Sequence, residues 1–186
     1  MSENTSKTIY EWDIEKKEER VKAKNGEHPW GDTGQLILFL LFMVLWAADS
    51  FFLEMSTSLS GYLPLYLRLL VMILAMMIAV YLAKSGHVVV SHEHRHAGVV
   101  ATGAFRYVRH PLYLASLLFY FGLAVSTACL FSFGLLLVIF LFYDYIAGYE
   151  ENVLEVKYGE DYLHYKDKTG KWVPNPKRII DISKLN

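Results

Sequence analysis

Basic and acidic side chains form two groups in the second half of this 186-residue sequence. The first group begins with His92 to His96 (HEHRH) and runs on to the segment Arg106 to Tyr113 (RYVRHPLY), and the second is the pair Glu150 and Glu151. Guanidinium and imidazole groups bind carboxylates, and a glutamate binds an ammonium group. If the fold brings the two groups together, they form a site suited to a zwitterionic ligand. The simpler alternative is that these charges only flank membrane helices and that the proline only begins a helix.

The composition indicates a membrane protein. Hydrophobic residues make up 54% of the chain and charged residues 20%, and no charged residue occurs from Leu112 to Tyr143. The formal net charge is -1, so no excess of positive charge would attract nucleic acid, and the composition excludes a disordered chain. The single cysteine, Cys129, excludes an intrachain disulfide and a metal site built from cysteines.

The apolar segments predict an all-α integral membrane fold with four transmembrane helices, at about residues 35–53, 63–83, 109–127 and 132–149. The first two segments have the length that a helix needs to cross a hydrocarbon core of about 30 Å. The uncharged stretch that follows would be roughly 48 Å long as one helix, so it must fold back. We place its turn within Ser126 to Gly134, where small and hydroxyl-bearing residues interrupt the larger apolar ones. The last two spans then form a helical hairpin.

The distribution of Lys and Arg predicts that both termini are cytoplasmic. Six of these residues precede Gln35, four lie between Lys84 and Arg109, and seven follow Gly148, whereas the two opposite loops have none. We therefore expect a polar cytoplasmic tail at residues 1–34 and a single membrane domain at 35–186. Its loops and its cytoplasmic segment 150–186 should cover the site. Because the hairpin arms are antiparallel, both charged groups should lie at this cytoplasmic face.

The motifs around these charges resemble a known superfamily. The segment Thr102 to Tyr113 (TGAFRYVRHPLY) is followed by EENVL and by a G-x-x-Y-x-x-Y pattern that begins at Gly159. Together they are similar to the C-terminal half of the isoprenylcysteine carboxyl methyltransferase and phospholipid methyltransferase superfamily, over roughly residues 97–174. The resemblance implies a small integral membrane enzyme that binds S-adenosylmethionine near the cytoplasmic ends of the last two spans and methylates a lipophilic or amphiphilic acceptor, such as a membrane lipid.

The resemblance also implies roles for individual residues. It assigns to the cofactor site His96, Val99, Val100, Phe105, His110, Pro111, Leu112, Tyr113 and Glu150. It places Arg109, Glu150 and Glu151 at the catalytic centre, and it leaves open which of the two glutamates is catalytic. The family's histidine position falls on Ala97, and we expect the neighbouring His96 to take its place. Glu150 and Glu151 differ by about 100° around a helix, so we expect one to bind the cofactor and the other to pair nearby.

One departure from the family concerns the acceptor. Isoprenylcysteine enzymes carry a substrate-side arginine one helical turn before the first glutamate, and that position is Ile146 here. The entrance then lacks a fixed positive charge, which disfavours a prenylcysteine carboxylate as the substrate. We expect a neutral or amine-bearing amphiphile instead, which enters through a lateral opening at the inner leaflet. This opening should be lined near Tyr143, Ile146 and Ala147.

Three alternatives remain open at this stage. His92, His94 and His96 alternate with other residues, so an extended segment would align three imidazoles as a zinc site requires. A sterol-reductase-like enzyme that uses NADPH also carries an R-H-P-x-Y-like element, although its extra spans and longer cofactor loop are missing here. A non-catalytic four-span scaffold or small transporter could retain the motif as well.

A separate expectation concerns two charged residues within the first two spans. Asp49 and Arg68 should lie at similar depths near the outer ends of consecutive antiparallel helices. Since ionisable groups within membrane helices usually pair, we expect a structural contact between them. The alternative is that each side chain extends separately to the outer interface.

Overall fold

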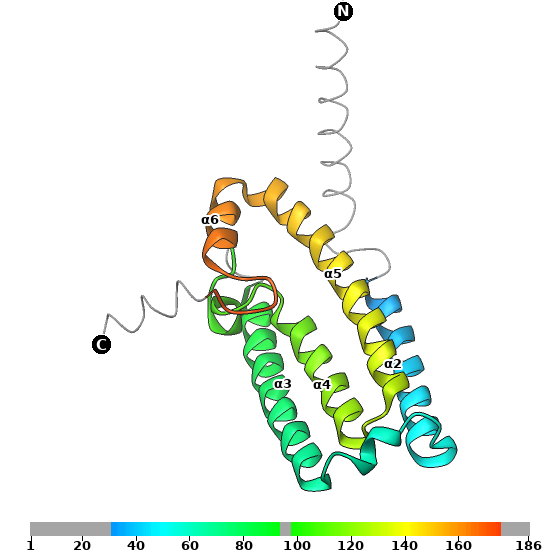
Figure 1. The fold of residues 1–186 in the computed structure, drawn as a ribbon. Helices are drawn as coiled ribbons and strands as arrows, with labels where there is room; N and C mark the ends of the chain where they lie inside the picture. Colours follow the sequence, from blue (N-terminus) through cyan, green and yellow to red (C-terminus); the bar gives the residue numbers. More distant parts are fainter. Residues whose placement is uncertain (1–30, 94–97, 176–186) are drawn as a thin grey trace, which may run out of the picture.

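The computed structural model describes residues 31–93 and 98–175 (Figure 1). Its helices are α2 (Gly31–Ala48), α3 (Leu65–Glu93), α4 (Pro111–Thr127), α5 (Leu130–Tyr158) and α6 (Glu160–Lys168). The described residues contain no β-strand, and their one isolated β-bridge joins Val108 to Gly170. The predicted all-α fold is therefore confirmed. Nearly all of the expected N-terminal tail, together with His94 and His96, lies outside the described residues.

Three of the described helices are long and apolar enough to cross a membrane. They are α2 with its continuation to Leu53, the first part of α3 to Val88, and α5. Large apolar side chains such as Val44, Ile73 and Leu141 are exposed along these helices, as expected for surfaces that face lipid. The fourth apolar helix, α4, has 17 residues and a length of roughly 26 Å, so it falls below the usual length of a span.

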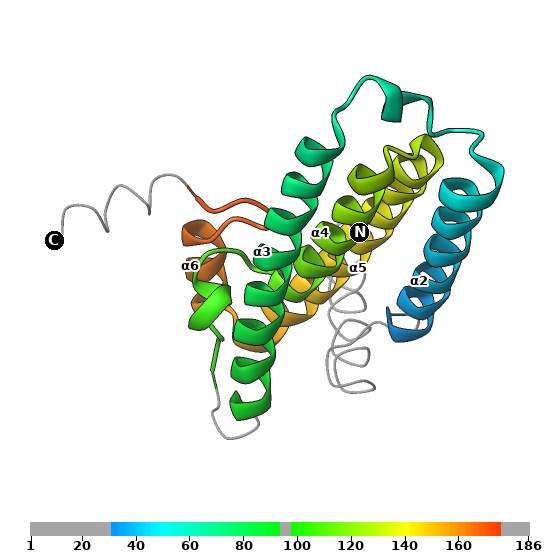
Figure 2. The same ribbon diagram turned by 90° about the horizontal axis from the view of Figure 1, so that it is seen from below.

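The helices lie in the order α3, α4, α5, α2 across the molecule (Figures 1 and 2). Small residues allow α3 and α4 to approach each other closely, because a Cβ atom on Gly122 would lie 3.2 Å from Met76 Cε. Another group of buried residues joins α2, α4 and α5. Its members are Phe42, Leu117, Tyr120, Ala124, Ile139 and Tyr143. This packing holds the beginning of α4 beside the second half of α5, where the charged residues lie.

Two helices extend further than the sequence predicted. The second predicted span ends at residue 83, whereas α3 continues to Glu93, and the fourth ends at residue 149, whereas α5 continues to Tyr158. The end of an apolar run marks where a helix leaves the hydrocarbon core. The helix itself can extend beyond that point, because its backbone hydrogen bonds also form in water. Glu150 and Glu151 consequently lie within α5.

The turn between α4 and α5 is shorter than predicted. Only Ala128 and Cys129 connect the two helices, and both lie within the expected segment Ser126 to Gly134. Ala128 adopts the left-handed conformation with φ 54° and ψ 35°, and its N–H caps the last turn of α4. This conformation ends a helix within one residue, so the chain needs no longer loop.

The expected contact between Asp49 and Arg68 is wrong. The Asp49 carboxylate accepts hydrogen bonds from Met55 N–H at 3.0 Å, from the backbone and hydroxyl groups of Ser56, and from Cys129 Sγ at 3.1 Å. Arg68 donates to the carbonyl oxygens of Leu63 and Ser126. The chain turns back directly after Leu53, which brings the donor groups of Met55 and Ser56 close to Asp49. These nearby groups satisfy the Asp49 carboxylate, so it does not need the arginine on the next helix as a partner.

Candidate active site

The start of α4 fixes the positions of Arg109 and His110. His110 is the residue before the helix and Pro111 is its first residue, a position that suits proline because the N–H there has no partner within the helix. The His110 carbonyl accepts the first helical hydrogen bond, from Leu114 N–H at 3.0 Å. The two side chains before the proline are thereby directed toward the second half of α5.

Arg109 and Glu151 form a buried ion pair. Arg109 Nε donates to Glu151 Oε1 at 2.9 Å, and Nη2 donates to Oε2 at 3.4 Å. Lys166 of α6 brings a second positive charge to 3.6 Å from the same carboxylate, and it also contacts Glu155. A buried carboxylate is costly unless it is paired, and these partners satisfy Glu151. The expected convergence of the R-H-P motif with the glutamate pair is present.

His110 lies between the two glutamates. Its Nε2 is 3.1 Å from Glu151 Oε1, and its Nδ1 is 3.7 Å from Glu150 Oε2. Tyr113 donates its hydroxyl hydrogen to Glu150 at 2.5 Å, and its ring stacks on His110 with centroids 5.7 Å apart. Although the glutamates diverge around α5, both reach one imidazole because its two nitrogens point in different directions. Glu151 is the glutamate that pairs with nearby charges, as expected of one of the two.

The segment after α6 completes this cluster. It belongs to the cytoplasmic segment 150–186 that we expected to cover the site, but its individual contacts were not predicted. We call residues 169–173 the C-terminal strap. Arg109 N–H donates to Gly170 O at 2.9 Å, and Arg109 Nη1 donates to Thr169 O at 2.5 Å. Trp172 packs against His110 with ring centroids 5.9 Å apart. The sequence offered no signal for these contacts, because they join residues about 60 positions apart and no recognisable motif marks residues 169–173.

The other residues that the resemblance assigned to the cofactor lie around this cluster or away from it. Pro111 and Leu112 face Gly86 of α3, where a Cβ atom would come within 2.9 Å of Leu112. Phe105 lies nearby on the helical turn Gly103–Arg106, and its carbonyl accepts a hydrogen bond from Tyr165 at 2.7 Å. Val99 and Val100 are half-buried in the segment before that turn and are not part of the charged cluster. His96 lies outside the described residues.

The structure does not support the extended histidine segment that a zinc site would require. The backbone of His92 belongs to the end of α3, so it is helical and does not continue an extended run. His94 and His96 lie outside the described residues. Among the residues that are described, no group of three His, Cys, Asp or Glu side chains could hold a metal ion.

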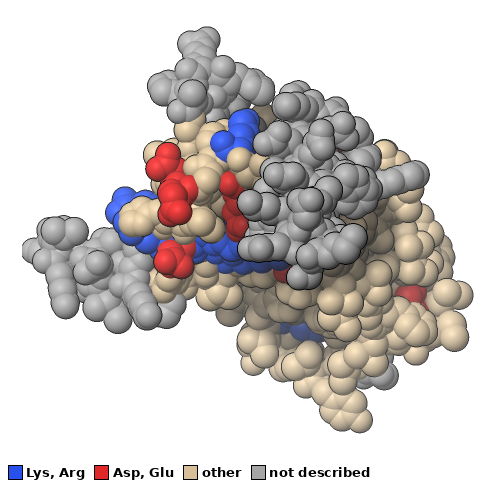
Figure 3. Space-filling view, turned by 90° about the horizontal axis from the view of Figure 1, so that it is seen from above, with Lys and Arg blue, Asp and Glu red and all other residues tan. Residues whose placement is uncertain are grey.

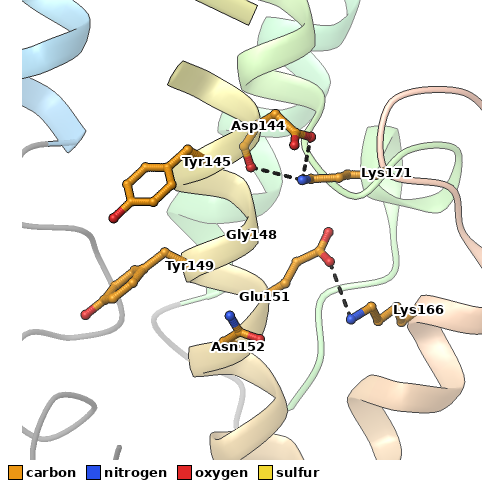
Figure 4. A pocket seen from close by; sticks show the side chains of 8 residues that line it. All are labelled: Asp144, Tyr145, Gly148, Tyr149, Glu151, Asn152, Lys166 and Lys171. Carbon is orange, nitrogen blue, oxygen red and sulfur yellow. Dashed lines mark hydrogen bonds and ion pairs between the residues drawn. The ribbon is translucent and has the colours of Figure 1, made fainter. Parts of the chain in front are cut away.

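The expected lateral opening is wrong as placed. Tyr143, Ile146 and Ala147 are 1%, 0% and 0% exposed, so this face of α5 is packed inside the helix bundle. Another part of α5 borders a groove of about 470 Å³ (Figure 4). The residues that line it are Asp144, Tyr145, Gly148, Tyr149, Glu151, Asn152, Lys166 and Lys171.

The groove adjoins the buried cluster through Glu151. In Figure 4, Lys171 contacts Asp144 on one wall, Lys166 points toward Glu151, and both tyrosines extend to the opposite side. Seen from the end of the molecule where α6 lies, acidic and basic side chains gather in one region of the surface (Figure 3). Charges of both signs thus stand next to a space large enough for a small molecule.

A buried tyrosine also lies beside the cluster. Tyr162 of α6 is buried, and this burial together with the nearby Glu151 carboxylate raises the pKa of its hydroxyl. A neutral phenol adds no third negative charge beside the two glutamates. The cluster thus contains carboxylates together with one guanidinium and one ammonium group, and such groups can bind the two ends of a zwitterionic ligand.

Comparison with curated proteins and with solved structures found no match to this chain. The sequence profile described as Phospholipid methyltransferase matches residues 59–161. The match spans more than half of the chain and includes α4, α5 and the four residues Arg109, His110, Glu150 and Glu151. It does not favour the reductase or scaffold alternatives. The chain therefore belongs to the phospholipid methyltransferase family.

Proposed function

We propose that the protein is an integral membrane methyltransferase that uses S-adenosylmethionine to methylate a lipophilic or amphiphilic acceptor. The observation that carries this proposal is the convergence of Arg109, His110, Glu150 and Glu151 at one end of α4 and α5. S-adenosylmethionine would supply an activated methyl group, and its amino acid end carries both a carboxylate and an ammonium group. The balanced charges of the cluster and groove fit such a molecule.

The contacts suggest different roles for the two glutamates. Glu151 is buried and already paired with Arg109 and Lys166, so we assign to Glu151 and Arg109 the task of holding the site in shape. Glu150 is more exposed and is held by Tyr113, which leaves it better placed to meet the ammonium group of the donor. Direct methyl transfer requires alignment and exclusion of water more than it requires many catalytic groups. An acceptor that arrives as an ammonium ion would also need a base.

We further propose four membrane crossings with both termini in the cytoplasm and a single membrane domain at 35–186. The turn between α4 and α5 supports this topology, since Leu130 N–H donates to Ser56 O at 3.1 Å. Ser56 belongs to the connection between α2 and α3, so these two connections meet at the end of the molecule opposite the charged cluster. The acceptor would enter from the bilayer.

Titration of the purified protein tests the proposed donor. Isothermal titration calorimetry should detect binding of S-adenosylmethionine and of its demethylated product, but not of NADPH. Replacing Glu150 by Gln should weaken donor binding by roughly 1–3 kcal/mol, the typical effect of losing a charge-assisted hydrogen bond.

The control is Asp161→Asn, because Asp161 is an exposed carboxylate on α6 outside the cluster. Glu155 is unsuitable as a control, since it shares Lys166 with Glu151. Binding of NADPH alone, or an equal loss of affinity in both variants, would contradict the proposal.

A further inference from the structure

His110 is held by more contacts than its glutamate partners provide. Its ring stacks on Tyr113 with an interplanar angle of 12°, and it packs against Trp172 at an angle of 42°. Its two nitrogens face Glu150 and Glu151. An imidazole with partners at both nitrogens and two aromatic neighbours has little freedom to rotate. The orientation of His110 therefore depends partly on where Trp172 lies.

Trp172 is itself fixed by α5. Its Nε1 donates to Asp144 Oδ1 at 2.8 Å, and its ring packs against Phe140 with centroids 5.6 Å apart. Lys171 donates to the same Asp144 oxygen at 2.6 Å. Asp144 precedes Glu151 by seven residues, so the two lie on the same side of the helix. One side of α5 thus holds a glutamate partner of His110 and the anchor of Trp172.

The backbone of the C-terminal strap sets the direction of Trp172. Gly170 O accepts a hydrogen bond from Arg109 N–H, and Val108 and Gly170 form a β-bridge. A Cβ atom on Gly170 would lie 1.9 Å from Val173 O, so the strap turns too tightly for any other residue. The residues directly before Pro111 therefore bind the strap that carries Trp172.

We infer that Trp172 is a positioning residue of the donor site, which acts by holding the ring of His110. Residue 172 lies outside the part of the chain that matches the family profile, which ends at 161. The predicted effect of Trp172 on donor binding rests on the proposed function. Its predicted effect on the orientation of His110 does not. The competing explanation is that Trp172 only fills the apolar core between Phe140 and its neighbours. A purely structural residue would affect stability without acting through His110.

The test compares two replacements in the full-length protein. Trp172→Leu removes the aromatic face but keeps an apolar side chain, and it should raise the Kd for S-adenosylmethionine about three- to tenfold. Trp172→Phe retains a ring against His110 and should recover most of that affinity. In a His110→Ala background, Trp172→Leu should change the Kd for S-adenosylmethionine by less than about twofold, because Trp172 then has no imidazole ring to hold.

The matched control is Trp46→Phe. Trp46 also donates its Nε1 hydrogen to partners in the bundle, at Leu123 and Thr127, and it packs on Phe51. Its partners lie in the final residues of α4, away from His110. This variant should lose stability without a change in the Kd. Similar changes in Kd for Trp46→Phe and Trp172→Leu, or additive losses in the double variant, would overturn the inference.

A second measurement does not require the donor. In protein labelled with isotopes at histidine, the NMR signals of His110 are those that disappear in His110→Ala. Trp172→Leu should shift these signals, because an aromatic ring no longer lies against the imidazole, whereas Trp46→Phe should not. If the wild type fails to bind S-adenosylmethionine, the proposed function fails, yet the NMR comparison still tests the contact. Unchanged His110 signals in Trp172→Leu would overturn the positioning role.

Discussion

Arg109 uses both its planar head group and its backbone to join three parts of the molecule. Its side chain donates to Glu151 of α5, to Lys166 O in α6 and to Thr169 O in the C-terminal strap. These acceptors lie around a guanidinium group that presents several N–H donors in fixed directions. A positive charge alone cannot reproduce this set of contacts, because an ammonium group has fewer donors and a different shape.

We therefore predict that Arg109→Lys destabilises the protein although it preserves the charge. The expected loss is about 1–3 kcal/mol in the free energy of unfolding, since the carboxylate and two carbonyl groups lose well-directed donors. Thermal or denaturant unfolding of the detergent-solubilised protein measures this loss. The exposed Arg106 supplies the control, because Arg106→Lys should change stability by no more than about 0.5 kcal/mol. Equal stability of the two variants would contradict the importance of the guanidinium geometry.

The sequence could predict one half of this cluster. Arg109 and His110 precede one apolar helix, and Glu150 and Glu151 lie toward the end of the next, so an antiparallel pair brings them together. Lys166 and Trp172 could not be found in this way, because they depend on how the chain after α5 folds back. The direction of α6 follows from Gly159, whose φ of 54° ends α5, and local residue types do not specify such a direction.

At the scale of elements, the connection between α4 and α5 depends on an unusual residue. Ala128 has a positive φ of 54°, a conformation that glycine adopts freely but that places the Cβ of other residues close to a carbonyl oxygen. The chain accepts this strain because the αL residue satisfies the last carbonyl groups of α4 and lets α5 begin two residues later. The strain should therefore be removable without changing the turn.

We predict that Ala128→Gly stabilises the protein by up to about 1 kcal/mol, because the left-handed conformation no longer opposes a Cβ atom. Ala124→Gly is the matched control. Ala124 is also buried, but it lies within α4, where glycine is expected to cost about 0.5–1 kcal/mol. Unfolding of both variants in the same detergent provides the measurement. Destabilisation of Ala128→Gly by as much as the control would show that the left-handed residue carries no strain.

Helix existence was easier to predict than helix ends. Long apolar runs identified all four apolar helices, because burial in lipid or in the bundle requires such runs. The full length of their polar extensions was not predicted: α5 continues past the glutamate pair through Glu155 and Lys157 and ends at Tyr158. These turns are stabilised by contacts such as that between Lys166 and Glu155, which the linear pattern of hydropathy does not report. The extension is what carries α6 and the strap back to Arg109.

At the scale of the whole molecule, two polar regions lie at opposite ends of the apolar helices. One is the charged cluster near α6, and the other contains Asp49, Ser56 and Cys129. In the second region, Ser56 also accepts a hydrogen bond from Phe131 N–H through its hydroxyl oxygen, which ties the loop after α2 to the start of α5. Both hairpin connections consequently lie together, as expected if α4 crosses the membrane in spite of its 17 residues.

This arrangement predicts which sites react with a membrane-impermeant maleimide in intact cells. The Tyr62→Cys and Leu130→Cys variants introduce thiols at exposed positions next to the two hairpin connections, and Lys168→Cys introduces one at the end of α6. The native Cys129 is 0% exposed and should contribute little background. We expect labelling of the first two variants from outside the cell, and labelling of Lys168→Cys only after the membrane is permeabilised. If Leu130→Cys instead reacts only after permeabilisation and Lys168→Cys reacts from outside the cell, α4 does not cross the membrane, and the chain has three spans.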